Sequence, residues 1–169
     1  SFEVAPQLRA YLGAAFRAVG EHDRARAVLD AVIADARARS APGVLPYALA
    51  RRAAVDLEEG RWASAEAALD EAAALALATG QEADRGIALA TRAWLDAARG
   101  REDACRAHAD AALDVARSLG QGGALDHARA ALALLDLGAG RMEEAAGHLD
   151  EALRVAAAAG WSDAAVPPV

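Results

Sequence analysis

The sequence has 169 residues and a formal net charge of -7, and 55% of its residues are hydrophobic. All 18 basic residues are arginine, and the acidic excess leaves no basic stripe to neutralise nucleic-acid phosphates. One cysteine cannot form an internal disulfide, and no uncharged apolar run reaches the ~18 residues of a membrane span. We therefore expect a cytoplasmic chain without a signal peptide and without direct nucleic-acid or membrane contact.

Alanine is the most frequent residue, and it is both the best helix former and the smallest side chain that fills a helix contact. No alternating Val/Ile/Thr run is longer than a few residues, so strand signals are absent. The composition therefore predicts an all-α chain of closely spaced helices. In chain order, the predicted helices span residues 8–19, 22–39, 45–59, 62–79, 82–99, 102–119, 124–139 and 142–159.

Local signals place the ends of these helices. Pro6 and Pro46 suit a first helical turn, where the missing N–H costs nothing. Glu102 and Asp103 fall where the helix dipole favours acidic side chains. Residues 120–123, GQGG, lack the Lys and Ser/Thr of a phosphate-binding loop, and we interpret them as a helix end followed by a flexible turn.

Glycines divide the chain into a grid of 20 residues within a repeat of 40, and a fixed period of this size predicts a helical-repeat array. The turn at residues 40–43 is the one departure from the grid. The expected units span about residues 5–40, 41–80, 81–120 and 121–160, and residues 161–169 open a further, truncated unit. The grid glycines are Gly20, Gly60, Gly80, Gly100, Gly120, Gly140 and Gly160.

Short connections make neighbouring helices antiparallel. Each helix is about 25 Å long at 1.5 Å per residue. We therefore predict four antiparallel helix pairs that stack into a right-handed superhelix, in one domain covering residues 1–169.

The second helix of each unit carries a common spacing of small and apolar residues after its glycine. In the second unit these residues are Gly60, Ala65, Leu69 and Ala72. The first helix carries a small residue seven positions before the glycine. The corresponding sets are Gly20, Ala25, Leu29 and Val32; Gly100, Cys105, Ala109 and Ala112; Gly140, Ala145, Leu149 and Ala152; and, in the first helices, Gly13, Ala53, Ala93 and Ala133.

This spacing resembles the tetratricopeptide (TPR) pattern, and Trp62 stands where that family often has an aromatic residue. The period is 40 rather than the usual ~34, so the helices are longer. The whole chain is similar to the sensor region of large ATP-dependent LuxR-family (MalT-like, STAND) regulators, and residues 161–169 are similar to a repeat junction in actinobacterial members. The resemblance implies a TPR-like α-solenoid between a P-loop ATPase and a helix-turn-helix.

No residue pattern indicates catalysis, a cofactor or a metal. His108 and His148 are 40 apart, which allows a metal pair, but no HxxxH or HxxH spacing exists, and we interpret them as partly exposed helix residues of common ancestry. Cys105 replaces a small packing residue and has no identifiable base. Adjacent carboxylates, such as Glu58 and Glu59, diverge around a helix and cannot act as an acid/base couple.

In TPR-like arrays the first helix of each unit lines a concave groove, and this placement marks the candidate binding residues. Trp94 either lines that groove or packs between helices. An apolar groove with few polar groups suits a small organic effector or an amphipathic peptide. The candidates are Tyr47, Arg51, Ile87, Trp94, His127 and Leu134, with Gln7, Ala14, Arg17, Ala54, Leu57, Ala97 and Leu137 on the same face and Arg92 and Asp96 flanking it.

The resemblance implies a non-catalytic sensor module of a LuxR-type regulator, which binds an effector or a partner domain. The alternative is a general scaffold that docks a peptide or another chain. An enzyme is disfavoured because no catalytic set is present. A solenoid cut between units exposes apolar surface at its ends, which predicts self-association through those ends.

Overall fold

The computed structural model describes residues 5–120 and 122–158. These residues form eight α-helices and one 3₁₀ turn, with no strand among them, so the prediction of an all-α chain is confirmed. In chain order the elements are α1 Pro6–Ala18, α2 His22–Ala38, the 3₁₀ turn Pro42–Val44, α3 Leu45–Glu58, α4 Trp62–Ala78, α5 Glu82–Ala98, α6 Glu102–Leu119, α7 Gly122–Gly138 and α8 Met142–Ala158.

The prediction of a flexible turn at residues 120–123 is wrong for its last two residues. Gly122 and Gly123 belong to the first turn of α7. The N–H groups of a first turn have no intrahelical partner, so glycine's weak helix propensity matters little there. Gly160 and the expected further unit at 161–169 lie outside the described residues.

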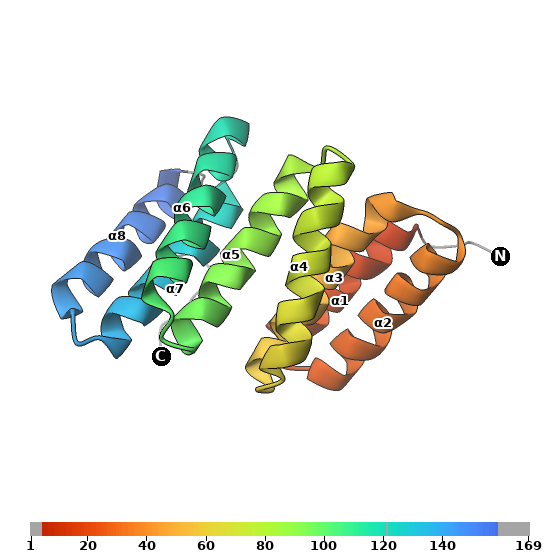
Figure 1. The fold of residues 1–169 in the computed structure, drawn as a ribbon, viewed down its shortest axis with the longest axis horizontal. Coiled ribbons are helices and arrows are strands. Elements are labelled where there is room, and N and C mark those ends of the chain that lie inside the picture. Colours follow the sequence, from red (N-terminus) through yellow and green to blue (C-terminus); the bar gives the residue numbers. More distant parts are fainter. Residues whose placement is uncertain (1–4, 121, 159–169) are drawn as a thin grey trace.

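The helix pairs follow one another across the molecule in chain order, with α1 and α2 at one end and α7 and α8 at the other (Figure 1). Each packs against its chain neighbours, and α1, α3, α5 and α7 also pack against one another in series. Helix α4 packs between α3 and α5, and α6 packs between α5 and α7. The result is a helical repeat-like all-α fold.

One type of helix end recurs throughout the array. At the end of α3, the Arg61 N–H donates to the Asp56 carbonyl at 2.7 Å and the Gly60 N–H donates to the Leu57 carbonyl at 3.1 Å. This pair of bonds is the Schellman motif, which needs a left-handed residue just after the helix. Gly60 has φ +74°, and Ser40 takes φ 51° at the equivalent point of the one turn that lacks the glycine. The 20-residue grid therefore marks helix ends, and Ser40 stands at the grid position that follows α2.

The core is built from small contacts, as the alanine content predicts. Ala25, Ala65, Cys105 and Ala145 are all buried at the same point of their helices. The closest approach is in the first pair, where a Cβ added to Gly13 would lie 2.6 Å from Leu29 Cγ. Small residues therefore set how closely the helices of a pair approach.

Candidate functional site

The first helices of the four units enclose a hollow on one face of the array. We call it the Trp94 hollow, and its volume is about 80 Å³. Because α1, α3, α5 and α7 each contribute to it, a molecule bound there contacts every unit. The lining residues are Arg17, Ala54, Leu57, Glu58, Thr91, Trp94 and His127.

Trp94 lines this hollow with 37% of its surface exposed. Its ring centroid lies 6.5 Å from that of His127, with an angle of 47° between the ring planes. Of the two placements that the sequence left open, the structure has the one in which Trp94 faces the hollow. Trp94 and His127 together form an aromatic corner between α5 and α7.

Burial and the charged groups around the hollow favour the neutral form of His127. Burial lowers the pKa of His127, and the positive charges of Arg51 and Arg17 lower it further. Arg17 is itself ion-paired with Glu58, which also lies 3.2 Å from His22 Nε2. A neutral imidazole has one donor and one acceptor nitrogen, so His127 offers hydrogen bonding without charge.

A second hollow lies at the other end of the same face, and we call it the Tyr47 hollow. The Tyr47 ring contacts the Tyr11 ring edge-on, with 4.9 Å between the ring centroids. Burial raises the pKa of Asp84, and the nearby Arg51 charge partly offsets that rise. The volume of this hollow is about 210 Å³, and its lining residues are Gln7, Ala10, Tyr11, Gly43, Val44, Tyr47, Gln81 and Asp84.

Arg51 lies between the two hollows. Its guanidinium carbon is 4.9 Å from the Tyr47 ring centroid, and its charge acts on both Asp84 and His127. Within the described part of the chain it forms no ion pair, and its buried Nε has no hydrogen-bond partner. Arg51 is therefore a cation available to a ligand on this face.

The remaining predicted residues are not in the hollows. Ile87 packs against the core formed by the first three units, and Leu134 packs against the core around α6 and α7. Arg92 and Asp96 do not flank the groove, contrary to the prediction. Arg92 pairs with Glu66 at 2.8 Å and with Asp70, both on α4, and Asp96 faces α6.

The sequence analysis did not predict that three aspartates are buried. Asp56, Asp96 and Asp136 are at most 1% exposed, and each opens the same hexapeptide pattern, DxxxGR. The signal was therefore readable, as DLEEGR, DAARGR and DLGAGR. Burial is unexpected for these residues because aspartate is usually exposed.

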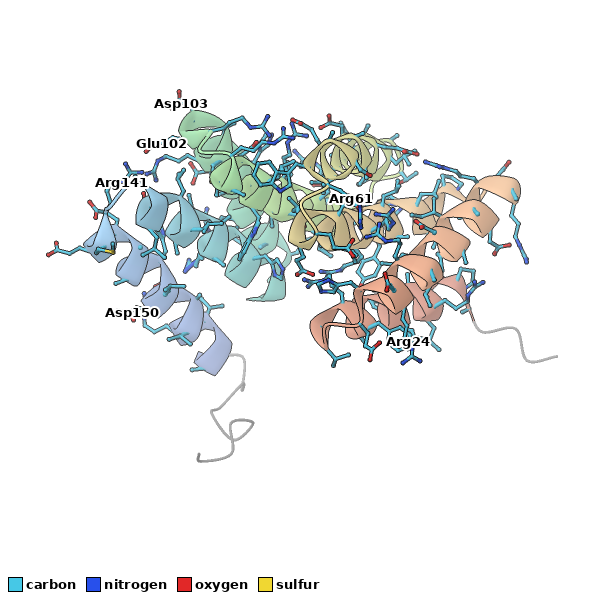
Figure 2. The ribbon with its side chains drawn as sticks, turned by 90° about the horizontal axis from the view of Figure 1, so that it is seen from below. Arg24, Arg61, Glu102, Asp103, Arg141 and Asp150 are labelled. Carbon is cyan, nitrogen blue, oxygen red and sulfur yellow. The ribbon has the colours of Figure 1, made fainter. Side chains whose placement is uncertain are left out.

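Asp136 shows how these carboxylates are satisfied. Arg141 Nε and Arg106 Nη2 each donate to its Oδ1 at 2.8 Å, and His148 Nε2 lies 3.3 Å from Oδ2. Burial alone would raise the pKa of Asp136, but the hydrogen bonds from Arg141 and Arg106 outweigh it and hold the pKa below its usual value. Arg141 also donates to Glu102 at 2.9 Å, and Figure 2 shows these two side chains together.

The buried aspartates also join consecutive units. Arg26 on α2 donates to Asp56 on α3 at 2.9 Å, and Arg106 on α6 bonds Asp136 on α7 in the same way. At the junction between α4 and α5 the equivalent position is Glu66, which reverses the charge.

Glu66 uses that reversed charge to bind arginines around Asp96. It accepts from Arg101 at 3.0 Å and from Arg92 at 2.8 Å, and it also bonds Arg99. Hydrogen bonds from Arg99 and Arg101 lower the pKa of Glu66 against the opposing effect of burial. Structural ion networks shift pKa values without catalysis, and the lowered pKa values of Glu66 and Asp136 are explained by their arginines.

The two histidines 40 residues apart belong to these networks. His108 Nδ1 lies 2.7 Å from Asp96 Oδ2, while His148 contacts Asp136. Across the residues that the structure describes, no group of three or more His, Cys, Asp or Glu side chains could hold a metal ion.

Burial and the Asp96 charge raise the pKa of the Cys105 thiol to about 11, so this buried thiol stays protonated at neutral pH.

Comparison with known proteins adds no assignment. No protein-family model matches the chain, and no curated protein matches it in sequence. Within the described ranges, none of the helices combines the length and the apolar character needed to cross a bilayer.

Proposed function

We propose that this chain is a non-catalytic, TPR-like recognition module that binds a small organic effector in the Trp94 hollow. The observation that carries this proposal is the convergence of Trp94 and His127 with side chains from α1 and α3 around one hollow. Small-molecule sites are concave and combine apolar walls with a few polar groups that fix orientation.

The lining specifies the chemistry of the effector. Trp94 offers an aromatic face, and Ala54 and Leu57 offer apolar walls. The neutral imidazole of His127 provides a hydrogen bond, whereas the charge of Arg17 is already matched by Glu58. The effector is therefore a planar or aromatic molecule that carries no net charge where it enters the hollow.

The position of the hollow suggests how binding is transmitted. In the proposed architecture the helix pairs form a right-handed TPR-like solenoid with a 40-residue period, as in the sensor region of a LuxR-type regulator. A ligand that touches the first helix of every unit stabilises one relative arrangement of the units. Binding shifts the equilibrium between conformations of the array, which is the property a sensor requires.

A peptide is the second candidate occupant, and the Tyr47 hollow favours it. Tyr47 and Glu58 are on the same helix and line different hollows. They are eleven residue steps apart, which is about 16 Å along the helix. That length matches an extended segment of about five residues. The free cation of Arg51 in the middle would bind a peptide carboxylate.

A thermal-shift screen of aromatic compounds tests the first candidate. A ligand at about 100 times its Kd stabilises by about 2.7 kcal/mol, which raises the Tm of a chain this size by about 5–10 °C. We expect Trp94→Ala to abolish the shift. Trp62→Ala is the matched control, because Trp62 is equally exposed, at 39%, but lies on α4 away from both hollows. A shift that survives Trp94→Ala would place the site elsewhere.

Tyr47→Ala separates the two candidates. It leaves the affinity of a small effector in the Trp94 hollow unchanged, and it weakens a peptide that fills both hollows by about tenfold. The regulator context has its own test in the neighbouring sequence. A P-loop ATPase before the array and a helix-turn-helix after it support the LuxR-type assignment, whereas neighbours of another kind favour the scaffold.

A further inference from the structure

Helix α8 presents an apolar face at one end of the array. Leu149 is 45% exposed and Leu153 is 67% exposed. In the preceding units Leu69 is equivalent to Leu149 and Leu113 to Leu153, and they are 1% and 7% exposed. Leu69 belongs to a core cluster that includes residues of α5, and Leu113 belongs to one that includes residues of α7. The α8 face, which we define as Ala146, Leu149 and Leu153, is therefore a helix-packing surface with no helix on it among the described residues.

Helix α1 presents the complementary face at the opposite end. Leu8 is 61% exposed, whereas Ala48, Ala88 and Ala128 at the equivalent positions are buried. Leu12 is 49% exposed, whereas Leu132 at its equivalent position is 5% exposed.

Ion pairs show which way this side of a first helix faces. The residue equivalent to Leu12 in α3 is Arg52, which pairs with Asp30 on the preceding α2 at 2.6 Å. In α5 it is Arg92, which pairs with Asp70 on the preceding α4. The α1 face, which we define as Leu8, Leu12 and Phe16, is thus the side on which a first helix receives the preceding second helix.

One charged pair that joins internal units is missing from both end faces together. The position of the buried aspartates Asp56 and Asp136 is Phe16 in α1, and the position of the arginine Arg106 is Ala146 in α8. A lone aspartate or arginine on one face would leave a buried charge unpaired. Because both partners are replaced by apolar residues, the two faces match each other.

We propose that the α8 face of one copy of this chain binds the α1 face of a second copy, head to tail, with the packing that α6 and α7 have inside one copy. Such an interface uses two different surfaces, so each added copy exposes a new binding face and the assembly is open-ended. This association is independent of effector binding, because neither face contributes to the Trp94 hollow.

Two single substitutions test this geometry. Leu12→Glu blocks the α1 face and Leu153→Glu blocks the α8 face, and both side chains are exposed, so folding measured by circular dichroism is unchanged. Placing a carboxylate in an apolar contact weakens association by about tenfold or more. By light scattering and sedimentation, the unmodified chain gains mass with concentration beyond that of a dimer, and each variant alone is a monomer. The matched control is Leu77→Glu, which changes a 64% exposed leucine on α4 and leaves assembly intact.

Mixing the two variants distinguishes head-to-tail binding from other arrangements. An equimolar mixture forms a dimer and stops there, because one intact α1 face meets one intact α8 face while the other ends carry carboxylates. The proposal is overturned if the unmodified chain stays monomeric up to near-millimolar concentration. It is also overturned if Leu12→Glu alone still dimerises, which indicates α8-to-α8 pairing, or if the mixture stays monomeric.

Discussion

Replacing Asp136 with alanine tests whether the buried carboxylates hold the third and fourth units together. Asp136 is 1% exposed, and it accepts hydrogen bonds from Arg106 on α6 and Arg141 after α7. Removing one partner of a fully buried ion pair costs about 3–5 kcal/mol. The cost here is smaller because the two arginine side chains are 39% and 32% exposed and both also bond Glu102. We expect a loss of about 2 kcal/mol.

Asp136→Asn separates the charge from the shape of this side chain. The amide oxygen still accepts a hydrogen bond, so we expect a loss of about 1 kcal/mol at neutral pH. The folded-state pKa of Asp136 is lowered, so its contribution to stability is present above the unfolded-state pKa. That contribution is lost as the pH falls through the lower, folded-state pKa. The asparagine variant therefore loses less stability than the original chain when the pH is lowered below about 4.

Urea unfolding followed by circular dichroism measures both effects. The midpoint falls while the slope m stays constant, because the surface exposed on unfolding does not change. Asp150→Ala is the matched control, since Asp150 is an exposed aspartate further along α8 (Figure 2), and we expect a change within about 0.5 kcal/mol. If Asp136→Ala costs no more than Asp150→Ala, the buried network does not stabilise the junction and our reasoning fails.

Two further substitutions test the backbone and the packing of the helix pairs, both by urea unfolding. Ser40→Gly removes the backbone strain of a left-handed serine with φ 51° and stabilises the chain by about 0.5–1 kcal/mol. The control Ser118→Gly, inside α6, destabilises the chain, and equal effects of the two substitutions would contradict the role of the glycine grid. Gly13→Ala places a Cβ 2.6 Å from Leu29 Cγ and destabilises the chain by about 1 kcal/mol net. The control Gly147→Ala on α8 meets nothing within 4 Å and stabilises the chain by about 0.5–1 kcal/mol, and a stabilising Gly13→Ala would refute the close approach of α1 and α2.

The helices were predictable because two independent signals agree on most of them. Alanine content sets the class, and the glycines set the ends. The structure shows why, since Gly60 and Gly140 take positive φ after their helices. The exceptions have local causes. Ser40 takes the same conformation without being glycine, and Gly122 begins a helix that its glycines appeared to forbid.

The candidate site was predictable only in part. Placing the first helices on one face brought Trp94 and His127 to the same hollow, but it also included Ile87 and Leu134, which pack against the core. Successive residues turn by about 100° around a helix, so a small rotation moves a side chain from a groove to a core. Periodicity identifies the face of a helix to within about one residue, and neighbouring helices decide the rest.

The junctions between units show how this chain specifies the order of near-identical helices. If α4 packed on α7, Glu66 would meet Asp136, and two carboxylates would be buried together. Two like charges in contact destabilise a helix interface, so the reversed charge at Glu66 disfavours the pairing of α4 with α7. In the observed order Glu66 instead receives Arg101 and the neighbouring arginines of its own junction. The buried charges contribute less to total stability than to the choice between alternative arrangements of similar alanine-rich surfaces. The end faces on α1 and α8 lack such a buried charge pair, so they can pack against another chain.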